Sequence, residues 1–267
     1  MTSPMALLAH QTALGWQLRA GDPGVMLVSG TGLDLEAGLD TQHRARLSEL
    51  IASPDFAFTQ FVRQSWCIGR TKALARLTLS VLPAATGRQL VHDWIARGGG
   101  AVLDPFSEAE NFFDFAAARL EDPSHALTIC RMEQAALRAG DATLTFTAPD
   151  RQLVDEFGTV VCRGKGAGLV RFFARPDHLL ACVSAEKPLP ALSEDSLPIL
   201  FAPGIVDLCR PATQEETSCW GRLQTPASVA VLIEEGYPRS LIESLLDIGA
   251  IDIISGTLSV TSLLDKY

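Results

Sequence analysis

The spacing of hydrophobic residues changes near Gly140, and this change constrains the fold of the 267-residue chain more than any other feature. From Thr41 to Gly140, apolar residues recur every three or four positions, as on one face of an α-helix. Beyond Gly140 the spacing shortens toward two, which is typical of β-strands. Because helices and strands occupy separate stretches instead of alternating, we predict an α+β fold and not an α/β fold.

The stretch 41–140 predicts a compact bundle of about five helices. Its apolar stripe is divided by residues that end helices, namely Pro83, the Gly98–Gly100 run, Asp104-Pro105 and Asp122-Pro123. Residues 1–40 are less regular; a short strand around VMLV and a glycine-rich loop are the expected features there.

The stretch 141–210 predicts a central antiparallel sheet. The candidate strands are LTFTA, TVVC, GLVRFFA, LLACVSA and LPILFA, and the gaps between them are too short for the crossover helices that parallel strands need. The cluster Gly164–Gly168 lies between two of these runs. We interpret it as a hairpin loop, since a phosphate loop would lead into a helix.

The stretch 211–267 predicts a winged-helix-like segment, with a helix from Thr225 through Glu235, a second from Arg239 to Leu246, and two short strands around Ser255-Gly256. This order leaves open a DNA-binding transcriptional regulator. The second helix, however, offers one arginine against Glu243 and Asp247, and carboxylates repel phosphates.

The overall charge also disfavours nucleic acid, because 22 basic and 31 acidic residues leave a net charge of −9. The N-terminal segment has no basic stretch and only a short apolar run, MALLA, so we expect a cytoplasmic protein without a membrane span.

Cysteine and histidine spacing predicts no metal or cofactor site within this chain. The six cysteines include no CxxC pair, and none of the five histidines is four residues from another. No GxSxG motif is present. Cys67 and Cys130 lie in apolar helical surroundings that favour buried thiols, although a stand-alone enzyme using one of them as nucleophile remains an alternative.

Two pairs of charged residues are candidates for a partner interface. Arg131 and Glu133 interrupt the apolar run ALTICRMEQAALRA and, two positions apart, project from different helix faces. Either they join the bundle to the sheet through buried hydrogen bonds, or they contact a partner subunit. Arg63 and Arg70 are seven apart and share a helix face, which is either solvated or directed toward a partner.

Two motifs carry a resemblance to a known family. They are Cys130-Arg131-Met132-Glu133-Gln134 and the later LPILFAPGI around Phe201 to Gly204, joined by the order of helices before sheet. In these features the chain resembles the MbnC-type companion subunits of MbnB-type TIM-barrel iron oxygenases, and within them the TglI-like branch. The resemblance covers about residues 55 to 210.

The resemblance implies a non-catalytic subunit that binds the leader of a ribosomally made precursor peptide and docks on the oxygenase as a heterodimer. The iron would belong to the partner. The holoenzyme would modify a peptide cysteine, by carbon excision toward 3-thiaglutamate or by oxazolone and thioamide formation as in methanobactin.

For the peptide site we predict an open sheet edge, because strand addition gives affinity through backbone hydrogen bonds. The candidate is Leu169–Phe173, with Arg171 meeting an acidic leader and Phe172 or Phe173 filling a pocket. An interior strand is the alternative. The C-terminal segment is a second candidate surface for the leader.

Overall fold

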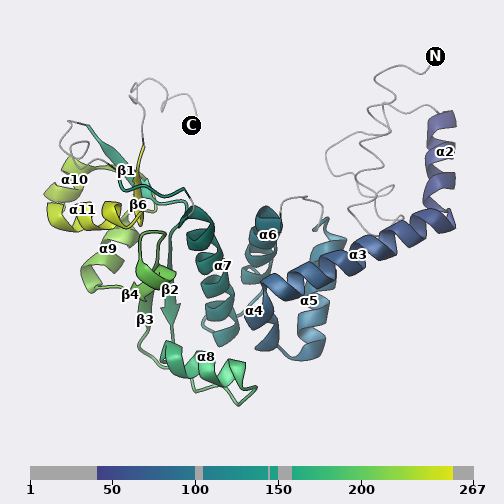
Figure 1. The fold of residues 1–267 in the computed structure, drawn as a ribbon, viewed down its shortest axis with the longest axis horizontal. Helices are drawn as coiled ribbons and strands as arrows, with labels where there is room; N and C mark the ends of the chain where they lie inside the picture. The colour runs from purple at the N-terminus through teal and green to yellow at the C-terminus, as the bar shows by residue number, and fades with distance from the viewer. Residues whose placement is uncertain (1–40, 100–104, 144, 150–157, 255–267) are drawn as a thin grey trace. The chain divides into compact units, whose positions relative to one another are not determined.

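The computed structural model describes residues 41–99, 105–143, 145–149 and 158–254 (Figure 1). Over these residues the chain is mostly helical and holds two small antiparallel sheets, which confirms the predicted α+β class. It divides into two compact units. The first comprises Met1–Cys130 with Val183–Lys187, and the second Arg131–Cys182 with Pro188–Tyr267.

Helices form the first unit. Pro54 and the preceding Ser53 begin the longest of them, since the Ser53 hydroxyl accepts a hydrogen bond from the Phe56 N–H at 3.2 Å. The helices are α2 (Thr41–Ile51), α3 (Pro54–Leu74), α4 (Arg76–Ser80), α5 (Ala84–Ala96), α6 (Pro105–Ala117) and the beginning of α7 (His125–Thr143).

Aromatic rings fill the core of this unit between α5 and α6. Trp94 packs edge-on against Phe112 with ring centroids 5.4 Å apart, and its indole N–H donates to the Asn111 side-chain oxygen at 2.8 Å. Phe113 and Ile129 are fully buried nearby in the same unit. None of the described helices combines the length and the apolar character that a membrane span needs.

The second unit contains both sheets. One has the order β5-β1-β6, from Ala227–Ser228, Val160–Arg163 and Ile251–Ile253. The other has the order β2-β3-β4, from Gly168–Phe172, Leu197–Phe201 and Cys209–Pro211. All neighbouring strands are antiparallel. The rest of α7, from Arg131 onward, lies in this unit with α8 (Pro176–Ser184, up to Cys182), α9 (Gln214–Arg222), α10 (Val229–Glu234) and α11 (Arg239–Asp247).

The predicted hairpin at Gly164–Gly168 is wrong, because β1 and β2 belong to different sheets. Gly164 is needed at its position because the backbone of Gly249 and Ala250 lies very close to it. The Gly164 N–H donates to the Ala250 carbonyl at 2.9 Å, and a Cβ at Gly164 would lie 2.3 Å from the Gly249 carbonyl oxygen.

Two predicted strands are also wrong. LLACVSA forms helix α8, where Leu179, Cys182 and Val183 are buried at helical spacing. A run this short is apolar enough for either structure, and Pro176 with Asp177 at the start favours the helix. In LTFTA, the described residues 145–148 form a turn and irregular backbone.

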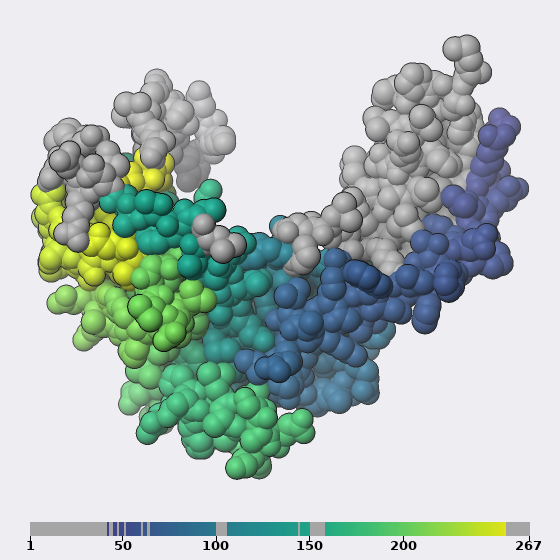
Figure 2. Space-filling view, viewed as in Figure 1, coloured from purple at the N-terminus to yellow at the C-terminus, as the bar shows by residue number. Residues whose placement is uncertain are grey.

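The C-terminal segment packs three helices against the β5-β1-β6 sheet, and α10 and α11 lie together in yellow in Figure 2. The helix predicted from Thr225 begins later, since Ala227 pairs with β1 and the Ser228 hydroxyl caps α10. The central strand of this sheet is β1, which comes from far earlier in the chain. The strand predicted beyond Ser255 lies outside the described residues, as do the features predicted in 1–40, so the winged-helix likeness stays a prediction.

Candidate functional site

In the sheet β2-β3-β4, the hydrogen bonds between β3 and β4 show which backbone groups of β3 point toward each neighbouring strand. The Ala202 N–H donates to the Leu208 carbonyl at 3.0 Å, and the Ala212 N–H donates to the Pro198 carbonyl at 2.9 Å. In an antiparallel strand, both backbone groups of one residue point the same way and those of the next point the other way. The backbone groups of Leu200 therefore face β4 as well.

The same alternation orients β2. Ile199 faces away from β4 and pairs with Val170, so the backbone groups of Val170 are directed toward β3. Those of Leu169 and Arg171 are directed away from β3. Among the strands of the described residues, β2 is at the end of its sheet. Within the described residues, the backbone groups of Leu169 therefore face the edge of this sheet.

This edge lies in a cleft of about 400 Å³, which we call the basic cleft. Helix α7 lines one side, and Trp220 of α9 lines the other. The full lining is Arg131, Gln134, Ala135, Arg138, Arg163, Gly164, Lys165, Ala167, Gly168, Leu169, Val170 and Trp220, all from the second unit.

Helix α7 approaches β2 closely because both strand and helix carry small residues at the contact. A Cβ on Gly168 would lie 2.8 Å from the Ala135 Cβ. On the opposite face of the strand, Leu169 packs against the C-terminal core that includes Leu200 and Trp220. The basic cleft is thus a groove along the strand edge between two packed walls.

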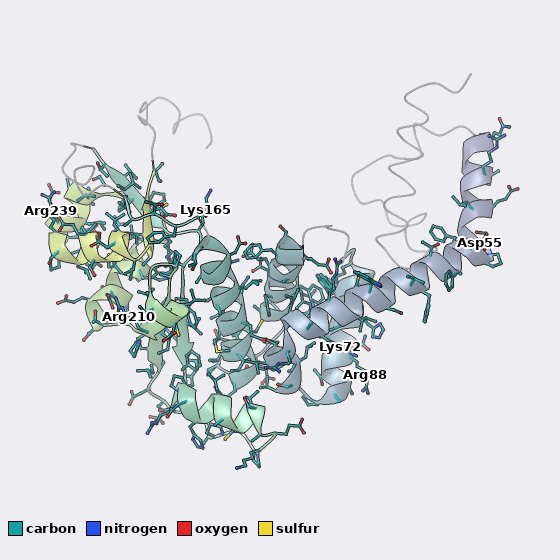
Figure 3. All side chains as sticks on the ribbon, viewed as in Figure 1. Asp55, Lys72, Arg88, Lys165, Arg210 and Arg239 are labelled. Atoms are coloured by element: carbon teal, nitrogen blue, oxygen red, sulfur yellow. The ribbon has the colours of Figure 1, made fainter. Side chains whose placement is uncertain are left out.

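Four of the lining side chains are cationic, and no lining residue is acidic. Arg131 and Lys165 are exposed, and Lys165 is labelled in Figure 3. Arg138 is half-buried. A carboxylate lies close by, since the Lys165 backbone N–H donates to Asp252 at 3.1 Å. The exposed ammonium and guanidinium groups favour an anionic ligand in the cleft.

Arg163 fixes one wall. Its Nε and Nη2 donate to the Trp220 carbonyl at 2.9 and 2.6 Å, and its guanidinium lies 5.0 Å from the centre of the Trp220 ring. Burial lowers the pKa of this guanidinium from its ordinary value, which still leaves it charged at neutral pH. Arg163 therefore holds Trp220 in place and keeps a positive charge behind it.

The three predicted peptide-binding residues have different surroundings. Arg171 is exposed and shares a strand face with Leu169. Phe172 is only 1% exposed and faces the other side of the sheet, where it lines an apolar pocket of about 340 Å³ with Met132 and Ile199. Phe173 is half-buried, and its carbonyl accepts a hydrogen bond from the Ser193 N–H at 2.6 Å.

The four predicted partner-interface residues also lie in different surroundings. Arg70 donates through Nη2 to the buried Glu108 carboxylate and lies 6.0 Å from the Trp66 ring, so it takes part in the packing of the first unit. Arg131 is exposed in the basic cleft, and Glu133 is half-buried on α7. The side chain of Arg63 lies outside the described residues.

All six cysteines are buried or half-buried in the structure. None of the six cysteines forms a disulfide, and Cys67 and Cys130 are buried. Burial raises the pKa of the Cys219 thiol to about 11, and it also raises the pKa of Cys162 and of Cys209. Within the described part of the chain, no three His, Cys, Asp or Glu side chains are grouped to hold a metal ion.

Sequence reasoning missed Arg138, Arg163 and Lys165 as members of one site. The sequence feature that could have indicated this site is the glycine cluster. Gly164 and Gly168 allow close packing against neighbouring segments, and Lys165 between them lines the basic cleft beside β2. Neither a protein-family model nor a curated protein matches the chain. The candidate site is therefore defined by its own geometry and charge.

Proposed function

We propose that this chain is a non-catalytic partner subunit that binds a precursor peptide in the basic cleft and presents it to an oxygenase. The observation that supports this most directly is the edge of β2 at the base of a cationic groove. An extended peptide adds to such an edge through backbone hydrogen bonds, while alternate side chains enter flanking pockets.

The charges of the cleft favour an acidic peptide. A strand beside Leu169 would direct alternate side chains toward α7, with Arg131 and Arg138, and toward the opposite wall, with Arg163 and Lys165. Carboxylates on either face of the peptide would therefore meet cationic side chains and could accept charge-assisted hydrogen bonds. Arg171, exposed farther along the same strand, would extend the contact.

The rest of the proposal follows from the family resemblance. The partner would be a cytoplasmic TIM-barrel iron oxygenase of the MbnB type, and the modified residue a peptide cysteine. Iron would be held by the partner. This chain would contribute peptide binding and docking, with product chemistry toward 3-thiaglutamate or toward oxazolone and thioamide groups.

Peptide binding is tested with fluorescein-labelled peptides of about ten residues that alternate Val with Glu, or Val with Lys. Fluorescence anisotropy should show saturable binding of the Glu peptide only. Leu169→Pro removes the N–H at the open edge and should weaken binding about tenfold. Leu169→Ala keeps that N–H and is the matched control. Equal binding to both variants would exclude strand addition.

The oxygenase role is tested by co-expressing the chain with an oxygenase and a precursor peptide encoded beside it. We expect a heterodimer whose iron depends on the oxygenase, and peptide modification only when both proteins are present. Modification by the purified chain alone would refute a non-catalytic role. So would full activity of the oxygenase without this chain.

A further inference from the structure

We propose that the first unit carries a docking surface for an acidic amphipathic helix of a partner protein. The surface consists of an exposed apolar stripe on α3 and a cation-rimmed groove formed by α3, α4 and α5. It lies in the first unit, and the proposal does not depend on peptide binding by the second.

The stripe consists of Phe58, Phe61, Val62 and Trp66. Their spacing of three and four residues places them on one face of α3, opposite Phe56 and Cys67, which are buried. Phe58, Phe61 and Trp66 are 67%, 66% and 68% exposed. Large aromatic side chains gathered on one exposed helix face mark an interaction surface.

The groove continues the Phe61 side of this face toward the end of α3, whereas Trp66 lies on the other side of the stripe. Ile68 and Lys72 follow Phe61 by seven and eleven residues, so the three share one side of the helix. With α4 and α5 they enclose about 460 Å³. The groove is lined by Ile68, Lys72, Arg76, Leu79, Ser80, Ala84, Gly87, Arg88, Val91 and His92.

The groove has an apolar floor and a positive rim. Ile68, Leu79 and Val91 form the floor, while Lys72 and Arg88, labelled side by side in Figure 3, are exposed at the rim. Arg76 is also exposed and lines the groove. Its lining includes no carboxylate, so a ligand that enters it must supply the negative charge.

The dimensions favour a helix over the other anionic ligands. Phe58 and Lys72 are fourteen residues apart, which at 1.5 Å per residue is about 21 Å. A small amphiphile would fill the groove and leave the aromatic stripe uncovered. A bilayer surface would cover the stripe and leave the concave groove unfilled. A helix with an apolar stripe flanked by Asp and Glu covers both.

The test uses a fluorescein-labelled model helix of about 18 residues, with Leu at helical spacing and Glu beside it, titrated with the full chain. We expect saturable anisotropy. Arg76→Glu combined with Arg88→Glu should raise Kd at least about tenfold, and Phe61→Ala should do so about as strongly. Lys187→Glu, an exposed cation outside the stripe and groove, should leave Kd unchanged. Circular dichroism checks that each variant is folded.

Several results would overturn the proposal. A Lys-containing version of the model helix that binds equally well would remove the role of the cations. Preferential binding of dodecanoate, or of vesicles containing phosphatidylserine, would assign the surface to a small amphiphile or a membrane. If the chain self-associates and Phe61→Ala abolishes that self-association, the surface would be assigned to a second copy of the chain. Leu169→Pro should not affect this binding, so failure here is distinct from failure at the basic cleft.

Discussion

Arg210 and Glu216 form a two-pronged ion pair that joins β4 to the first turn of α9. The guanidinium donates to both carboxylate oxygens, at 2.5 and 2.9 Å. Glu216 also accepts from the Thr213 N–H at 2.8 Å, while the Thr213 hydroxyl accepts from the Glu216 N–H at 3.1 Å. This capping box begins the helix. The Arg210 hydrogen bond holds the pKa of Glu216 below its ordinary value.

This lowered pKa makes part of the stability depend on pH. The unfolded chain binds the proton more tightly, so the stabilisation is complete above the ordinary pKa of 4.5 and is lost as pH falls through the folded pKa. Glu216→Gln should cost about 2 kcal/mol near neutral pH. Urea unfolding at several pH values should show this difference shrinking in acid. A difference that is constant with pH would contradict the assignment.

Gly164 allows a close backbone approach that no other residue type permits. Because an added Cβ would meet the Gly249 carbonyl oxygen, Gly164→Ala should lower the free energy of unfolding by about 2 kcal/mol. Gly221, in α9, has nothing within 4 Å of an added Cβ, so Gly221→Ala should be neutral or stabilising. Equal effects of the two substitutions on urea unfolding would refute the packing argument.

At the scale of elements, α11 has one apolar face that is buried and one charged face that is directed outward. Ile242, Leu245 and Leu246 are buried against the sheet and its neighbouring helices. On the outer side, Arg239 donates to Glu243 at 3.0 Å. This i, i+4 pair neutralises the arginine on the outer face of the helix.

The burial of α11 leads to a direct prediction for its stability. Leu245 is 1% exposed, so Leu245→Ala should cost about 3 kcal/mol through lost burial and the cavity left behind. Ser244 at the preceding position is exposed, and Ser244→Ala should change the free energy of unfolding by less than about 0.5 kcal/mol. Urea titrations compare the two. Similar costs would mean that α11 is packed by another face.

At the scale of the whole molecule, an acidic chain contains two cationic recesses. The net charge is −9, yet Arg131, Arg138, Arg163 and Lys165 line one recess of the second unit. Lys72, Arg76 and Arg88 rim another in the first. The distributed negative charge opposes approach of an acidic ligand, while the local cations attract it at contact.

Salt separates these two effects. The cations of the basic cleft attract a bound acidic peptide over short distances. The acidic residues elsewhere on the chain repel it mostly over distances longer than a Debye length, about 10 Å, where salt already screens the repulsion. We therefore expect the attraction to dominate. Raising NaCl from about 0.05 to 0.5 M should therefore weaken binding of the Val/Glu peptide roughly tenfold. Arg131→Glu with Lys165→Glu should weaken it further and reduce the salt dependence. Tighter binding in high salt would show that overall repulsion dominates.

Periodicity along the chain was sufficient for the fold class, for the helices before Gly140, and for the strands at Val160, Gly168 and Leu197. These features depend on local spacing, because side chains three or four apart share a helix face and alternate ones share a strand face. The LLACVSA helix was missed because a short apolar run satisfies both patterns.

Strand pairing and the site were decided only by tertiary structure. Nothing in the spacing of TVVC shows that it pairs with Ala227 and Ile251 instead of the adjacent GLVRFF, because partner choice depends on which distant surfaces are buried together. The basic cleft likewise joins Arg131, Lys165 and Trp220, which are far apart in sequence. Local spacing determined the helices before Gly140 and three of the strands, and it indicated where an edge was plausible. Long-range packing determined which cations surround that edge.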